Sequence, residues 1–138
     1  MKRTVVMLTV ALVVGIVVGL IGNHVLIAQQ EPVKRTVLLK TDLAGIEGKD
    51  GLVYIIEVAP GATVPKHYHP GHELAYLLEG SLTLEVEGKP AATLKAGDTN
   101  YIPSKVVHGG KNASTTAPAK FVVFGLYEKG QPDTTFVK

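Results

Sequence analysis

The stretch that decides the fold is GATVPKHYHPGHELAYLLEG, residues 61–80, which holds three of the chain's five histidines within six positions. His67 and His69 are two residues apart, so on a β-strand both side chains leave the same face. Two imidazoles that face a barrel interior are costly to bury unless each ring nitrogen has a partner. The stretch therefore predicts a polar cluster that must be completed from elsewhere in the chain.

Glu73 begins the apolar run ELAYLLE, so its carboxylate meets the same burial cost as the two imidazoles. One divalent transition metal would remove all three costs, because Mn, Fe, Ni, Cu and Zn accept neutral imidazole nitrogens and ionised carboxylates as ligands. An H-x-H pair alone, however, is common on solvent-exposed strands. His72 is adjacent to Glu73, and we expect its side chain on the opposite face, outside the ligand set.

A further ligand has to come from another strand, and His108 is the one histidine that follows the cluster. It lies in YIPSKVVHGGKN, residues 101–112, after an apolar run. A lone histidine there would more often be a surface or hydrogen-bonded core residue, and the cluster is what makes it a candidate ligand. The glycines Gly109 and Gly110 predict a sharp bend of the backbone directly after it.

Outward from this stretch, the chain consists of short β-like runs separated by turn residues. The expected strands cover residues 35–40, 51–59, 73–79, 81–87, 91–96, 99–103 and 120–128. Short strands at this spacing are typical of a sandwich or barrel, and no stretch after residue 30 has a helical period. The 138 residues suit one domain, and we expect an all-β domain over residues 35–138.

The first 30 residues have a different character. Lys2 and Arg3 precede an apolar run over residues 4–22, and no charged residue follows until Glu31. A basic start, a long apolar run and small residues near a cleavage point are the pattern of an export signal. The sequence therefore predicts a periplasmic or extracellular domain.

Residues 1–28 have two alternative interpretations. Residues 1–28 are either a signal peptide cleaved after Ala28 or a membrane anchor, because the apolar run over residues 4–22 is close to the ~20 residues that span a bilayer. If it is uncleaved, this run is the expected membrane contact. Residues 29–34 are expected to form a linker or arm.

Charge and composition exclude several classes of partner and chemistry. The chain has 14 basic and 12 acidic residues, so removing Lys2 and Arg3 leaves a neutral domain of 12 against 12. Without a basic stripe, nucleic acid is not an expected partner. Cysteine is absent, which excludes disulfides, thiolate ligands and thiol nucleophiles. A small-molecule ligand or substrate remains the expected partner.

Two motifs in the chain resemble those of a known family. Residues 61–80 read G-x5-H-x-H-x3-E-x6-G, and residues 97–112 read G-x5-P-x-K-x2-H-x3-N. With 16 residues between them, they resemble the first and second motifs of the cupin superfamily. The departure is Lys105, which stands where the family usually has glycine. A lysine in the left-handed conformation there costs about 1 kcal/mol.

The resemblance implies a double-stranded β-helix, a small antiparallel barrel with a metal inside. It assigns the ligand roles to His67, His69, Glu73 and His108, and it implies a homodimer that associates through its sheets. Asn112 would hold the loop after His108. The turn glycines would be Gly61, Gly80 and Gly97.

The function implied by this resemblance is a metal-dependent enzyme with dioxygenase-like oxidation of a small organic molecule, ahead of isomerase or lyase chemistry. Glu73 would be both ligand and proton acceptor. The alternative is a non-catalytic extracytoplasmic protein that binds a small ligand or a metal. Four protein ligands close a tetrahedral zinc site but leave two positions open on an octahedral metal. The candidate aromatic walls of the pocket are Tyr54, Tyr76, Tyr101 and Phe124.

Overall fold

The structure is a computed structural model that describes residues 31–137. The expected signal peptide or anchor in residues 1–28 lies outside the described residues. Within residues 31–137, no helix is long and apolar enough to cross a membrane. Regular structure in this range consists of β-strands, as the sequence predicts.

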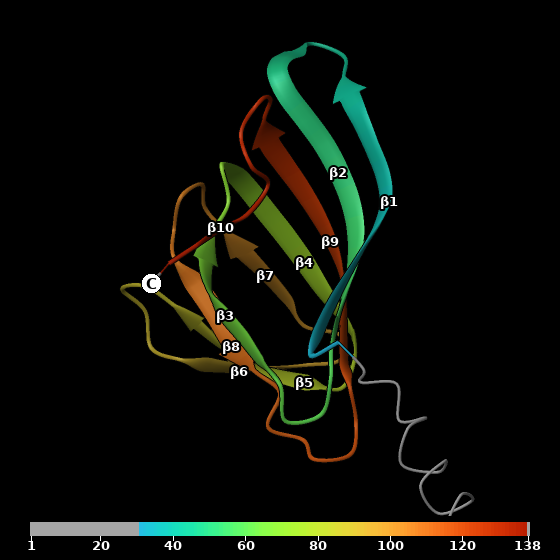
Figure 1. Cartoon of the computed structure of the whole chain (residues 1–138), viewed down its shortest axis with the longest axis vertical. Coiled ribbons are helices and arrows are strands. Elements are labelled where there is room, and N and C mark those ends of the chain that lie inside the picture. Colours follow the sequence, from blue (N-terminus) through green and yellow to red (C-terminus); the bar gives the residue numbers. More distant parts are fainter. Residues whose placement is uncertain (1–30, 138) are drawn as a thin grey trace, which may run out of the picture. The chain divides into compact units, whose positions relative to one another are not determined.

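The described residues form two antiparallel sheets that face each other (Figure 1). The first sheet has the strand order β1 (Val33–Leu43), β2 (Ile46–Val58), β9 (Ala119–Glu128), β4 (Gly71–Glu79) and β7 (Thr99–Ile102). The second has the order β10 (Thr135–Phe136), β3 (Thr63–Tyr68), β8 (His108–Lys111), β5 (Ser81–Val86) and β6 (Ala92–Lys95).

All seven expected strands are present, and the all-β prediction is confirmed. Strand β1 begins at Val33, inside the segment expected to be a linker. Strand β2 begins at Ile46 because its pairing with β1 continues up to the two-residue turn at residues 44–45. Strands β3, β8 and β10 were not in that expected set. The sequence HGGK of β8 has no β-branched or aromatic residue, and β10 has only two residues, so both depend on pairing with β3.

The sharp bend predicted at Gly109 and Gly110 is wrong, because both glycines lie in the extended strand β8. A Cβ atom added at Gly109 would come within 2.9 Å of the backbone oxygen of Val64, and one added at Gly110 within 2.9 Å of that of Thr83. Glycine is therefore needed here because the neighbouring strands approach closely, and not because the chain turns.

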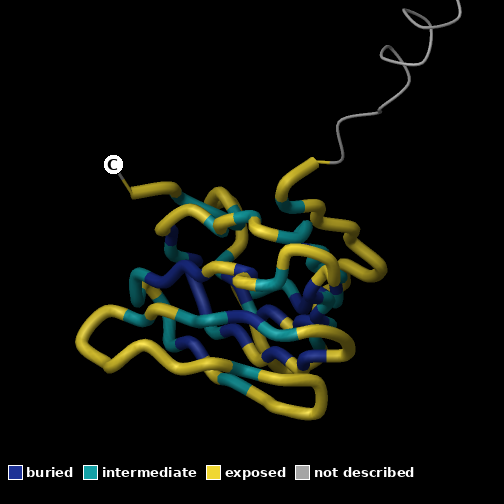
Figure 2. Tube along the Cα trace, turned by 90° about the horizontal axis from the view of Figure 1, so that it is seen from below, coloured by how far each residue is buried: buried dark blue, intermediate teal, exposed yellow. Residues whose placement is uncertain are grey.

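Strand β4 shows how the sheets divide the molecule into an inside and an outside. Its buried and exposed residues alternate, so that Glu73, Ala75 and Leu77 face the interior while Leu74 and Tyr76 face outward. Figure 2 shows the same division for the whole domain, with buried segments between the sheets and exposed loops at the ends. The first sheet therefore presents Glu73 to the interior.

Candidate metal centre

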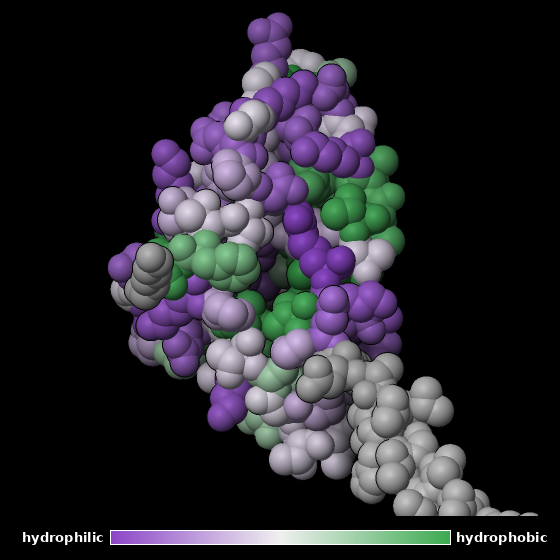
Figure 3. Space-filling view, in the orientation of Figure 1, coloured by the Kyte–Doolittle hydropathy of each residue, from purple (hydrophilic) through white to green (hydrophobic). Residues whose placement is uncertain are grey.

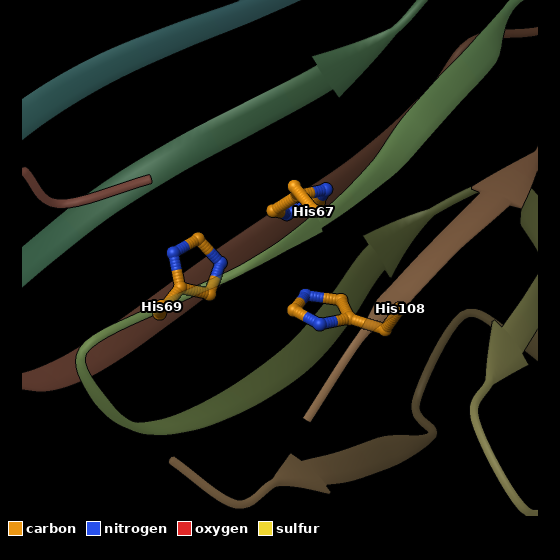
Figure 4. Close-up of side chains that lie close together, drawn as sticks. All are labelled: His67, His69 and His108. Carbon is orange, nitrogen blue, oxygen red and sulfur yellow. The ribbon is translucent and has the colours of Figure 1, made fainter. Parts of the chain in front are cut away.

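Three histidines from the second sheet meet in the interior. His67 lies in β3, His69 follows directly after that strand, and His108 begins β8, where it is the register partner of His67. One ligand atom of each residue lies within 4.8 Å of those of the other two. Figure 4 shows the three rings gathered around one space. All three are nearly excluded from solvent, which makes an accidental surface cluster an inadequate explanation.

Each ring is oriented by a hydrogen bond to the backbone. The Nδ1 atoms of His67, His69 and His108 lie 2.7, 2.6 and 3.0 Å from the carbonyl oxygens of Pro65, Asp133 and Val106. A carbonyl oxygen can only accept, so in each ring Nδ1 donates the proton. In the neutral tautomer Nε2 then carries the free lone pair, which is the arrangement found in metal-binding histidines.

Burial also favours the neutral form of these rings. It lowers the pKa of His67 to about 4, against the opposing effect of the hydrogen bond to the Pro65 carbonyl. Burial likewise lowers the pKa of His108. At neutral pH both side chains are therefore neutral imidazoles, the form that binds a metal.

Glu73 completes the polar group from the opposite sheet. Its Oε2 atom lies 2.8 Å from Nε2 of His69 and accepts hydrogen bonds from the hydroxyls of Tyr54 at 2.8 Å and Tyr127 at 3.2 Å. Burial alone would raise the pKa of this carboxyl. The contact with His69, helped by the hydrogen bond from Tyr54, outweighs burial and brings this pKa to about 2, so Glu73 is ionised.

The two tyrosines are almost fully buried, and their hydroxyls lie 2.7 Å apart. Burial first, and then the charge of Glu73, raises the pKa of both Tyr54 and Tyr127, so both phenols stay protonated and can donate. Tyr54 was expected only as a wall of the pocket, and Tyr127 was not expected in the site. The available signal was the alternation in β9, which places the Tyr127 hydroxyl on the buried face, where it needs a partner.

The donor set fits a divalent transition metal. It offers the Nε2 atoms of three imidazoles, each of which is held in place by a hydrogen bond through Nδ1. It also offers the carboxylate of Glu73, which is ionised and 8% exposed. His67, His69, Glu73 and His108 would hold such an ion, whose charge would offset the cost of burying the carboxylate.

A cavity of about 520 Å³ lies between the sheets and reaches this cluster. Its volume is within the range of small-molecule sites, roughly 300–1,000 Å³. The opening is visible in Figure 3 as a hollow with hydrophobic residues around it. Most of the wall is apolar, with Ile56, Leu82, Leu84, Phe121 and Val123 among its residues.

The prediction of aromatic pocket walls holds for Tyr54 and is wrong for Tyr76, Tyr101 and Phe124. The latter three lie on the outer face of the first sheet and are 40–50% exposed. Strand alternation is the reason, since their register partners also point outward. His72 is on this outer face as expected, with Nδ1 2.7 Å from the Tyr101 hydroxyl.

The second motif keeps its expected shape despite its lysine. Lys105 has φ of 63°, in the left-handed region, and its backbone N–H donates to the carbonyl oxygen of His69 at 2.9 Å. Asn112 is fully buried, and its Nδ2 donates to the carbonyls of Val58, Ala59 and Ala117. The predicted structural role of Asn112 is therefore confirmed. The turn at Lys105, three residues before His108, is joined to the backbone of His69 by the hydrogen bond from Lys105.

Comparison with known proteins agrees with this geometry. The family model described as "Cupin domain" matches residues 54–125. A germin-like protein from Morus alba is 34% identical over 79 residues, which are 54% of this chain and 38% of that protein. A 3-hydroxyanthranilate 3,4-dioxygenase from Xanthomonas euvesicatoria is 30% identical over 69 residues, 48% of this chain and 39% of that protein. The chain thus spans about two fifths of the length of these relatives.

The fold also has a solved counterpart. A conserved protein with a double-stranded β-helix domain from Klebsiella pneumoniae superposes with a TM-score of 0.64 at 22% identity, over 80% of this chain and 88% of that chain. This similarity confirms the double-stranded β-helix. With the family model covering more than half of the sequence, the chain belongs to the cupin domain family.

Proposed function

We propose that the protein is a metal-dependent enzyme that oxidises a small organic molecule in a dioxygenase-like reaction, with His67, His69, Glu73 and His108 as metal ligands. The observation that supports this most directly is the convergence of three carbonyl-oriented imidazoles and an ionised carboxylate beside a cavity of about 520 Å³. Similarity to a dioxygenase over 48% of the chain favours oxidation, and the substrate of that protein is not carried over.

Each residue of the site would have a distinct role. The metal, one of Mn, Fe, Ni, Cu or Zn, would supply Lewis-acid and redox chemistry toward substrate oxygens. The histidines would hold it through Nε2. Tyr54 and Tyr127 donate to Glu73 and keep its carboxylate anionic and oriented. The apolar wall excludes water, which strengthens the electrostatic interactions inside.

Glu73 is the group that we propose to accept a proton from the substrate. It is the ionised carboxylate of the cavity, and its Oε2 already accepts hydrogen bonds from two hydroxyls. A substrate O–H that entered the cavity beside the histidines would deliver its proton to the carboxylate oxygen that Tyr54 and Tyr127 do not contact.

The test of oxidation is oxygen uptake by metal-reconstituted protein with a panel of small diols, diketones and hydroxy acids. We expect uptake with at least one compound and its loss in His69→Ala, while His72→Ala keeps the wild-type rate. His72 is a matched control because it is on the outer face. If every compound is bound but recovered unchanged in air, the non-catalytic alternative replaces oxidation. Retained uptake in His69→Ala would contradict the mechanism.

We also propose that the protein is exported to the periplasm or the extracellular space and forms a homodimer. The leader pattern in residues 1–28 supports export. For the dimer, the support is a row of apolar residues across the outer face of the first sheet, joined by register from strand to strand: Leu39, Val53, Phe124, Leu74 and Tyr101.

The size of this face is adequate for a second copy of the chain. Five strands spaced about 4.8 Å apart and about 30 Å long give roughly 700 Å² per copy, near the ~800 Å² of a standard interface. Because the same row would meet itself about a two-fold axis, the contact would be closed and apolar.

A further inference from the structure

Arg35 is a cation on the inward face of β1. Register pairs Val33 with Val58, Arg35 with Ile56 and Val37 with Tyr54, so Arg35 occupies an inward position between two valines. Its side chain lines the cavity, and it is the one lysine or arginine among the described residues that does so. Its side chain is 29% exposed, so the guanidinium is partly desolvated and is more stable beside an anion.

The protein's own partner for this guanidinium is weak. Nη1 and Nη2 of Arg35 both lie 3.4 Å from a single oxygen, Oδ2 of Asp133, whereas charge-assisted hydrogen bonds are usually about 2.7–2.9 Å. The other oxygen of Asp133 lies 4.0 Å from Nζ of Lys40. A guanidinium has five N–H donors, and within residues 31–137 this one makes only those two long contacts. It therefore retains donors for a second anion.

The position of Arg35 connects it to the candidate metal centre. Its guanidinium carbon lies 4.2 Å from the centroid of the Tyr54 ring, and the hydroxyl of that ring donates to Glu73. The charge of Arg35 also acts on Tyr127, where it partly offsets the effect of burial on the phenol pKa. This cation–π contact with Tyr54 restrains the position of the guanidinium at the cavity.

We propose that Arg35 binds the carboxylate of the substrate, so that the site takes small organic acids with an apolar body. The carboxylate would form paired hydrogen bonds with N–H donors of the guanidinium that the two long contacts with Asp133 leave free. The apolar body would lie against the wall that includes Ile56 and Phe121. This inference rests on the proposed function for the identity of the reacting centre, and the recognition itself needs no metal.

The experiment measures binding of benzoate and of benzamide, its neutral counterpart, to the full chain by NMR titration. Both the metal-loaded and the metal-depleted protein are titrated. We expect the wild-type protein to prefer benzoate about tenfold in both forms, as one charge-assisted pair would give. Arg35→Gln should abolish the preference, and Arg35→Lys should keep part of it because a lysine supplies charge without the fork.

Lys34→Gln is the matched control. Lys34 is the neighbouring cation on the opposite face of β1, and its register partner is Glu57. This variant should keep the wild-type preference, and near-ultraviolet circular dichroism should show that each variant is folded.

Two results would overturn the proposal: no preference for benzoate in the wild-type protein, or an unchanged preference in a folded Arg35→Gln variant. The preference for benzoate is measured in the metal-depleted protein as well. If this preference is present but no metal-dependent oxidation is found, the proposed function is overturned and the role of Arg35 is not.

Discussion

At the scale of single residues, the Tyr54 hydroxyl is the contact that most directly controls Glu73. It donates to Oε2 at 2.8 Å inside the core, where a hydrogen bond to a charged group is strong. Tyr54→Phe removes this donor, and we expect it to weaken metal affinity about 10- to 100-fold, as loss of a ligand's supporting hydrogen bond does. Competition with a chelator of known affinity measures the change.

Tyr101→Phe is the control for that experiment, because its hydroxyl contacts His72 on the outer face. It should leave the affinity unchanged. An unchanged affinity in Tyr54→Phe would show that Glu73 is oriented without this hydroxyl.

Lys105 permits a second prediction at this scale. Its φ of 63° places a side chain in the left-handed region, which glycine enters without strain. We therefore expect Lys105→Gly to raise the free energy of unfolding by about 1 kcal/mol through relief of strain. The greater conformational entropy of glycine in the unfolded state offsets part of this gain. Urea denaturation measures it. Lys105→Ala removes the same side chain and keeps the strain, so an equal gain in that variant would contradict the explanation.

At the scale of strands and sheets, the sequence predicted more of the site than of its surroundings. His67, His69 and His108 were identified because the spacing of the two motifs is local information. The Asp133 carbonyl that orients His69 was not, since it lies 64 residues away and depends on how the C-terminal segment returns to β3. Register between distant strands is decided by the packed fold and is not visible in the order of residues.

The same distinction explains the errors in the predicted strands. Period-two alternation correctly separated the two faces of β4, and so placed Glu73 inside and His72 outside. It did not say which outward aromatic residues are far from the cavity, and Phe124 was misplaced for that reason. In β8, glycine was interpreted as a turn, although it is required by close neighbouring strands.

The outer face of the first sheet carries the prediction about assembly. Leu74 is 51% exposed and lies in the apolar row between its register partners Phe124 and Tyr101. Leu74→Lys would place two charges at a two-fold interface, and we expect it to convert a dimer into a monomer. Light scattering after size-exclusion chromatography gives the mass. Thr93→Lys, on the exposed strand β6, adds the same charge elsewhere and should leave a dimer. A monomeric wild-type protein would contradict the proposed dimer.

At the scale of the whole molecule, the buried ionisable groups predict how stability depends on pH. The pKa of His67 is lowered from 6.5 to about 4, so the unfolded state binds more protons between these values. The metal-free protein should therefore lose stability as the pH falls from about 6.5 to 4. Glu73, lowered from 4.5 to about 2, continues the loss below pH 4.5.

Thermal melting of chelator-treated protein across pH 4–8 checks this dependence. His67→Gln lacks the titrating ring and should flatten the upper part of the profile, while His72→Gln should leave it as in the wild type. A melting temperature that rises on acidification from pH 6.5 would contradict the assignment of a buried, neutral His67.

The central claim is a resident metal at His67, His69, Glu73 and His108, and its most direct test is the metal content of untagged protein by elemental analysis. We expect about one equivalent of a divalent transition metal in the wild type and in His72→Ala, and loss of that metal in His69→Ala. Spectroscopy of the bound ion then distinguishes an open site from a closed, four-coordinate zinc site, which would favour the binding alternative. A wild-type protein that holds no metal even after reconstitution would contradict the account.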